Sequence, residues 1–271
     1  MTPQKNVTVP LEQWINDIAE RAQLTDYMLK ESHLPGPRAN LGLSDRFTEC
    51  FGKLDLTDTA WELLNFWTIL SEGAIESNDP REFLAFCAVR ASGAYYGYAD
   101  EERQGVIRGI LKSAMNDSGW RLREAAAMGM QSVGEYDFTL LCQLLDRWGP
   151  GATQLEQRAF VAALAHPPLL KVHDNAVYCL NLATEIMDRL AANAGVQGDP
   201  EHFRVLSKGL EYSLSVFVAS EPVEGFVMLR KFAQSRDARI IKIVKSNLGK
   251  SRLSKKYGLQ VAEILNSISL L

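Results

Sequence analysis

The sequence lacks the motifs that most catalytic and metal-binding sites require. It has four cysteines, Cys50, Cys87, Cys142 and Cys179. None of them forms a CxxC pair, which excludes zinc knuckles and thioredoxin-type redox centres. It has four histidines, His33, His166, His173 and His202, and none belongs to an HExxH arrangement. GxSxG, Walker and GxGxxG motifs are also missing, so we expect no catalytic residue, no metal ligand and no cofactor.

Long apolar runs and strand-like alternation are missing as well. No stretch of about 18 apolar residues occurs, so we expect no membrane span. No segment alternates cleanly between apolar and polar residues, and no Asn-Gly or Asp-Gly hairpin signal occurs, so we expect essentially no sheet. The first nine residues are polar and lack the apolar core of a secretory signal, which favours a cytoplasmic protein. The net charge of −4 argues against a protein that coats nucleic acid generally.

Helical periodicity fills most of the chain. Apolar residues recur at spacings of three and four, as at Leu63, Leu64 and Trp67, which is typical of amphipathic helices with one buried face. Proline and glycine clusters separate these segments. The pattern predicts helices at 10–32, 40–53, 58–72, 81–97, 100–115, 119–133, 137–148, 153–165, 172–194, 202–218, 222–234, 237–248 and 257–270.

One segment carries a repeat signal. In Asp117-Ser-Gly-Trp-Arg-Leu-Arg-Glu-Ala-Ala-Ala127 an Asp in a turn is followed, five and six positions on, by Leu122 and Arg123. An Asp there can cap the helix and meet an arginine. Weaker copies lie 38 residues upstream, at Leu84, and 35 residues downstream, at Arg158, by subtraction of residue numbers. These steps match the periods of two-helix repeats.

This segment resembles the inner helix of a HEAT repeat. The resemblance is clear over about 80–165 and extends more loosely over about 58–250. It implies an all-α fold, a right-handed α-α superhelix of about five helix pairs. Residues 1–56 would form N-terminal capping helices, and residues 57–271 one continuous solenoid of HEAT-like repeats. The segment Leu34–Leu41, rich in proline, is either a rigid corner or a docking loop.

Charge is distributed unevenly along the chain. Between Arg230 and Lys256 there are ten basic residues and a single acid, Asp237, which gives +9. Subtracting these from the 29 basic and 33 acidic residues of the whole chain leaves 19 and 32, or −13. A basic patch of this kind can hold an acidic protein surface or phosphates, or it can be a solvated face that pairs with the chain's own acids.

These patterns favour a non-enzymatic interaction module that uses a concave row of inner helices. The partner would be another protein with an acidic surface, with nucleic acid as the alternative and no membrane. The residues expected to make polar contacts are Arg121, Arg123, Arg158, Arg239, Lys242, Lys245, Lys250 and Arg252.

A second resemblance supports an alternative function, that of a DNA-binding or DNA alkylation-repair protein. The DNA alkylation-repair glycosylases built from HEAT-like repeats are similar to this chain in length, helical character and basic repeat surfaces. Their site needs an acidic residue framed by tryptophans, and here Trp120 lies near Asp117 and Trp148 near Asp146. Neither segment matches that family's spacing closely. The competing interpretation of both tryptophans is packing in the core or at the edge of a repeat.

Overall fold

The computed structural model describes residues 9–53, 55–70, 78–192 and 199–270. Within these ranges every regular element is a helix and no strand occurs, which confirms the all-helical expectation. In the same part of the chain, no helix has both the length and the apolar character needed to cross a bilayer. The chain divides into two compact units, Met1–Tyr136 and Asp137–Leu271, which are described separately below.

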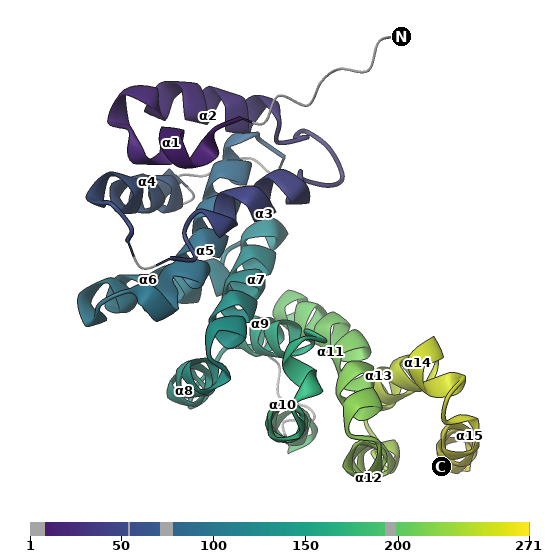
Figure 1. Cartoon of the computed structure of the whole chain (residues 1–271). Coiled ribbons are helices and arrows are strands. Elements are labelled where there is room, and N and C mark those ends of the chain that lie inside the picture. The colour runs from purple at the N-terminus through teal and green to yellow at the C-terminus, as the bar shows by residue number, and fades with distance from the viewer. Residues whose placement is uncertain (1–8, 54, 71–77, 193–198, 271) are drawn as a thin grey trace. The chain divides into compact units, whose positions relative to one another are not determined.

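The first unit is built around one buried helix, α5, drawn in blue in Figure 1. Its α-helices are α1 (Leu11–Asn16), α2 (Arg21–Lys30), α3 (Leu41–Glu49), α4 (Asp58–Ile69), α5 (Arg81–Tyr95), α6 (Glu101–Met115) and α7 (Trp120–Tyr136). Every residue from Glu82 to Gly93 is buried, because α2, α3, α4, α6 and α7 all pack on α5. A helix that is covered all round needs mostly apolar or small residues, and α5 has them except at Glu82 and Arg90, whose charges pair with Arg121 and Asp45.

Two glycines let α5 and α7 approach each other closely. A Cβ atom placed on Gly93 would lie 2.3 Å from the carbonyl oxygen of Gly129. A Cβ on Gly129 would lie 3.1 Å from the carbonyl oxygen of Val89. The two helices therefore meet backbone to backbone, and the small residues of the α7 segment serve this contact.

The N-terminal segment differs from the single helix predicted over 10–32. After α1, Asp17 adopts an extended conformation, and its carboxylate accepts a hydrogen bond from the backbone N–H of Ala19 at 2.9 Å. A short 3₁₀ helix, η1 (Ile18–Glu20), precedes α2. Aspartate competes for backbone donors in this way, so it begins a new helix instead of continuing the old one.

The second unit consists of eight α-helices in its described part. They are α8 (Phe138–Trp148), α9 (Gln154–Leu164), α10 (His173–Ala192), α11 (Pro200–Ser220), α12 (Pro222–Ala233), α13 (Ala238–Leu248), α14 (Ser251–Ser254) and α15 (Gly258–Ser269). Side chains cap several of them, and Thr153 with Glu156 forms a capping box on α9. The boundaries match the predicted helices to within a few residues, except that the prediction over 172–194 extends into 193–198, which lies outside the described residues.

These helices form two rows within the second unit. α11 packs between α9 and α13 in one row, and α10, α12 and α15 lie in the other (Figure 1). α11 and α13 run in the same direction, since Phe203 meets Arg239 near their beginnings and Leu210 meets Asn247 further along. Alternate helices of the sequence therefore lie side by side in the row that contains α11.

α14 was not predicted from the sequence. It has only four residues, and Lys250, the residue before it, makes no side-chain capping bond. Leu253 is completely buried, so the turn is held by its packing in the second unit. A helix this short gives no detectable periodicity, and only the tertiary contacts define it.

Candidate functional site

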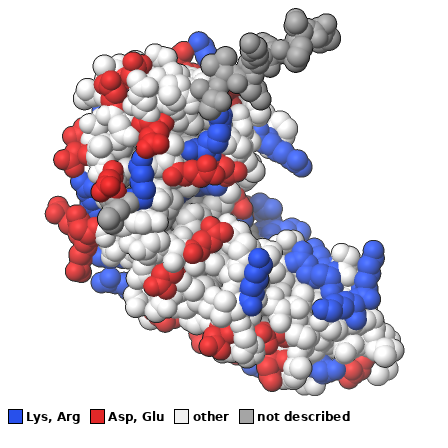
Figure 2. Space-filling model, viewed as in Figure 1, with Lys and Arg blue, Asp and Glu red and all other residues white. Residues whose placement is uncertain are grey.

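A cluster of basic side chains covers the exposed side of α11, α13 and α14 in the second unit. Figure 2 shows lysine and arginine atoms gathered over the part of this unit where Figure 1 places α13 and α14. We define the basic face by five residues, Lys208, Lys242, Lys245, Lys250 and Arg252. Four of the five were predicted as contact residues, and Lys208 was not.

A buried asparagine fixes α13 against α11 and so sets the register of the basic face. Asn247 is fully buried, and its side-chain oxygen accepts a hydrogen bond from the backbone N–H of Ser215 at 2.7 Å. Its amide nitrogen donates to the carbonyl of Leu210 at 2.8 Å. Because every polar group of this side chain has a partner, the contact fixes one position of α13 along α11. Lys245 lies two residues before it, at the exposed surface.

One carboxylate lies at the centre of the basic face. Glu211 is 8% exposed and accepts a hydrogen bond from the Ser207 hydroxyl at 3.1 Å. Lys208 Nζ lies 3.2 Å from Oε2, and Lys242 Nζ lies 3.4 Å from Oε1. Burial works to raise the pKa of Glu211, but the lysines and the hydroxyl favour the charged form more strongly, so its pKa is lowered. The carboxylate therefore stays ionised and draws two lysines together across the α11–α13 seam.

We expect Glu211→Gln to reduce the stability of the second unit at neutral pH and to have a smaller effect in acid. A group whose pKa is lowered on folding contributes stability above its unfolded pKa, about 4.3 for glutamate. That contribution is lost as the pH falls through the lower folded-state pKa. Urea unfolding of wild type and variant between pH 7 and pH 3 measures the difference. A gap that stays constant across this range would contradict the role given to the charge.

Several basic residues of the predicted charged segment already have acidic partners. Arg230 pairs with Glu263 at 3.0 Å, Lys231 with Asp188 at 2.5 Å, and Arg239 with Asp237 at 2.7 Å. In contrast, Lys245, Lys250 and Arg252 have no acidic partner among the described residues. Within that part of the chain, these three cations of the basic face are not neutralised by the protein's own acids, whereas Lys208 and Lys242 pair with Glu211.

An exposed aromatic residue that was not predicted from the sequence also belongs to this surface. Tyr212 on α11 is 50% exposed, and the guanidinium of Arg252 lies 4.7 Å from the centre of its ring. Tyr212 lies four residues after Lys208, so the i, i+4 spacing of exposed residues on α11 was an available signal. Its proximity to Arg252 depends on α14 and could not be read from the sequence.

Two predicted contact residues lie in the first unit, where they support the structure. Arg121 is 2% exposed and pairs with Glu82 at 2.9 Å, so it is not available at the surface. It also donates to the carbonyl of Gly36 at 2.9 Å. This bond anchors the proline-rich corner after α2, which favours the rigid-corner interpretation. Arg123 donates to the carbonyls of Asp117 and Ser118 at the beginning of α7.

The other two predicted residues lie elsewhere in the second unit. Arg158 on α9 faces α11, and a Cβ on Gly209 would lie 3.1 Å from its Cγ. Arg239 stacks on the ring of Phe203 at 4.9 Å and lines a cleft that is described below. Of the six predicted residues in the second unit, the structure brings together four, Lys242, Lys245, Lys250 and Arg252.

The two tryptophans compared with the glycosylases have different environments. Trp148 is 6% exposed and stacks on Phe160, with ring centres 6.4 Å apart, and the neighbouring Asp146 accepts the hydroxyl of Tyr178 at 2.8 Å. Trp120 is 51% exposed and carries the Arg121 guanidinium 4.7 Å from its ring centre. Trp148 is therefore a core residue, whereas Trp120 is a surface residue.

The comparisons add no relative from which a site could be transferred. No family model, no curated protein and no solved structure matches this chain. Among the described residues, no group of three or more His, Cys, Asp or Glu side chains is placed to hold a metal ion.

Proposed function

We propose that this chain is a non-enzymatic interaction module that binds an acidic protein surface through the basic face of its second unit. The observation that carries the proposal is the set of cations without acidic partners in the described chain, Lys245, Lys250 and Arg252. Exposed charges of one sign that lack partners attract and orient a surface of the opposite sign.

The construction of the face favours a protein partner. α13 is held to α11 by the buried Asn247, so the cations are presented on a fixed scaffold. A rigid surface loses little conformational entropy on binding. The ring of Tyr212 offers an apolar surface with a polar hydroxyl, a combination that is frequent at the centre of protein interfaces.

We also propose that the helices form a HEAT-like solenoid, with α5, α7, α9, α11 and α13 as its inner helices. The close packing of α5 on α7, and of α11 on both α9 and α13, supports this arrangement within each unit. In such a stack each helix pair contacts its neighbours, and the inner helices form the binding surface. A cytoplasmic location is part of the same proposal.

Reversing two charges of the basic face tests the proposal. We expect Lys245→Glu with Lys250→Glu to weaken partner binding at least tenfold, about 1.4 kcal/mol. Partners are first captured from extract of the native host at low salt, and the affinity of each purified candidate is then measured for both proteins. Wild-type binding should also weaken as salt is raised, because the contacts are exposed ion pairs.

The matched control carries the same change in charge on other elements of the second unit. Arg147→Glu with Lys171→Glu reverses two exposed cations on α8 and on η4 (Leu169–Lys171). The control should bind like wild type. If both double variants lose binding equally, the partner senses net charge only. If neither loses binding, the basic face is not the interaction surface, and either result rejects the proposal.

Nucleic acid is the second candidate, and the exposed ring of Tyr212 is the observation that favours it. Basic grooves that bind single strands add aromatic side chains on which bases stack. An electrophoretic shift assay at low salt, with single-stranded and duplex DNA, distinguishes the two functions. Tight, steeply salt-dependent DNA binding that is lost in the Lys245→Glu, Lys250→Glu variant would show that the partner is DNA and not a protein.

A further inference from the structure

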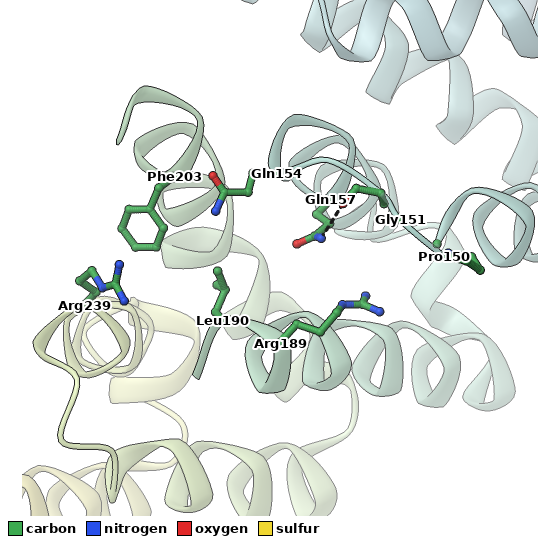
Figure 3. A pocket seen from close by; sticks show the side chains of 10 residues that line it. Pro150, Gly151, Gln154, Gln157, Arg189, Leu190, Phe203 and Arg239 are labelled. Atoms are coloured by element: carbon green, nitrogen blue, oxygen red, sulfur yellow. Dashed lines mark hydrogen bonds between the residues drawn. The ribbon is translucent and has the colours of Figure 1, made fainter. Parts of the chain in front are cut away.

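A cleft of about 420 Å³ opens in the second unit beside the first turns of α9, α11 and α13. Figure 3 shows Phe203 and Arg239 on one side, Arg189 on the other, and Leu190 between the two arginines. The glutamines of α9 and the Gly149–Ala152 turn also line it. Its volume lies within the range of small-molecule sites in proteins, about 300–1,000 Å³.

The lining contains polar groups that the fold does not use. Arg189 and Gln154 have no side-chain hydrogen bond or ion pair among the described residues. Gln157 donates one amide hydrogen to the carbonyl of Ala152 at 2.9 Å, which leaves its other hydrogen and its oxygen. These groups come from α9 and α10, and Figure 3 shows them around the same open space.

The charge of the cleft is positive but small. Among the described residues of its lining there is no acid, and Arg189 and Arg239 are the two cations. Asp237 engages Nε and Nη2 of Arg239, and the same hydrogen bonds lower the pKa of that carboxyl group, so this arginine is largely neutralised. Arg189 is the cation that remains. The helix N-termini add little, since Thr153, Asp199 and Asp237 already cap them.

The geometry points to a binding site for an organic monocarboxylate that carries an apolar body. The carboxylate lies against the guanidinium of Arg189, whose planar fork matches two carboxylate oxygens. The apolar body lies toward Leu190 and Phe203, and the guanidinium of Arg239 lies 4.9 Å from the centre of the Phe203 ring. The glutamine amides suit an amide group beside the carboxylate.

Because Arg189 is the one cation left free among the described residues of the lining, the cleft favours a ligand with one negative charge over a doubly charged phosphate. A phosphate monoester carries close to two charges at neutral pH and generally needs several donors or cations. The mixed apolar and amide lining also fits the last residue of a peptide, or a free N-acylated amino acid, better than an inorganic ion. This site is independent of the proposed protein interface, because Arg189, Leu190 and Phe203 are not part of the basic face.

The probes are acetyl-phenylalanine and its amide, which differ only in the carboxylate. A hexapeptide ending in phenylalanine, with a free or an amidated C-terminus, distinguishes a peptide source from a free small carboxylate. We expect calorimetry on the full chain to detect the two carboxylates and neither amide. Tighter binding of the peptide than of acetyl-phenylalanine identifies a peptide terminus as the ligand, and equal or weaker binding identifies a free carboxylate.

Variants locate the binding in the cleft. Arg189→Gln should weaken binding at least tenfold, and Phe203→Ala should weaken it several-fold with the carboxylate preference retained. The control is Arg204→Gln, an exposed arginine on α11 that pairs with Glu201 outside the lining. Unchanged circular dichroism shows that each variant is folded. Failure of both carboxylates to bind at millimolar concentration overturns the inference, and so does binding that Arg189→Gln leaves intact.

Discussion

Replacing Arg121 with methionine is expected to destabilise the first unit by about 3–5 kcal/mol. The guanidinium is buried and pairs with Glu82 at 2.9 Å, and it also donates to Asn78 Oδ1 at 2.7 Å and to the carbonyl of Gly36 at 2.9 Å. Its removal leaves a carboxylate that is 6% exposed without its counter-charge. An unpaired buried charge costs far more than the pair contributes, which is why the expected loss is large.

A double-mutant cycle tests the reason for this loss. Glu82→Leu added to Arg121→Met removes the stranded carboxylate, so the double variant should be more stable than the Arg121→Met protein. Arg81→Gln is the control, because Arg81 pairs with Asp79 at the exposed surface and should have little effect on urea unfolding. Losses that simply add in the double variant would show that the two side chains act independently.

Gly93→Ala is expected to destabilise the first unit by about 1–3 kcal/mol or more. The new Cβ would lie 2.3 Å from the Gly129 carbonyl oxygen and 2.4 Å from the Gly129 Cα. Both of these atoms are backbone, so no side chain can rotate away and the helices α5 and α7 must separate. Because α5 is the buried centre of the unit, their separation also disturbs the packing of the other helices.

The same substitution on an exposed helix provides the control. Gly109 lies in α6, and a Cβ there would have no atom within 4 Å. Alanine is the better helix former, so Gly109→Ala should stabilise the protein by about 0.5–1 kcal/mol. Opposite signs for the two variants in thermal or urea unfolding would assign the Gly93 effect to steric overlap. A stabilised Gly93→Ala protein would contradict the close α5–α7 contact.

The helices could be predicted because their signals are local. Apolar spacing, capping residues such as Thr153 and Asp199, and prolines at helix starts all act within a few residues of the chain. Segments that depend on distant contacts were missed. α14, for example, is held by the burial of Leu253. The break after α1 was missed for a local reason, because the side chain of Asp17 competes for a backbone donor.

The functional residues could be predicted only in part. The density of lysine and arginine after Arg230 is a property of the sequence, and it located four of the five residues of the basic face. Which cations are neutralised depends on partners far away in the chain, such as Glu211 for Lys242. Arg121 is an arginine in the same helix as Arg123 and was predicted as a surface contact, yet it is buried in the core.

By itself, the sequence determined that the described chain is helical, where most helices begin and end, and that positive charge is concentrated toward its C-terminal part. The tertiary structure alone decided that Arg121 is buried, that Tyr212 joins the basic face, and that Arg189 and Phe203 border one cleft. The physical reason is the separation along the chain over which each kind of interaction acts. Helix formation and capping depend on neighbours within about four residues, whereas burial, ion pairing and clefts depend on residues that only folding brings together.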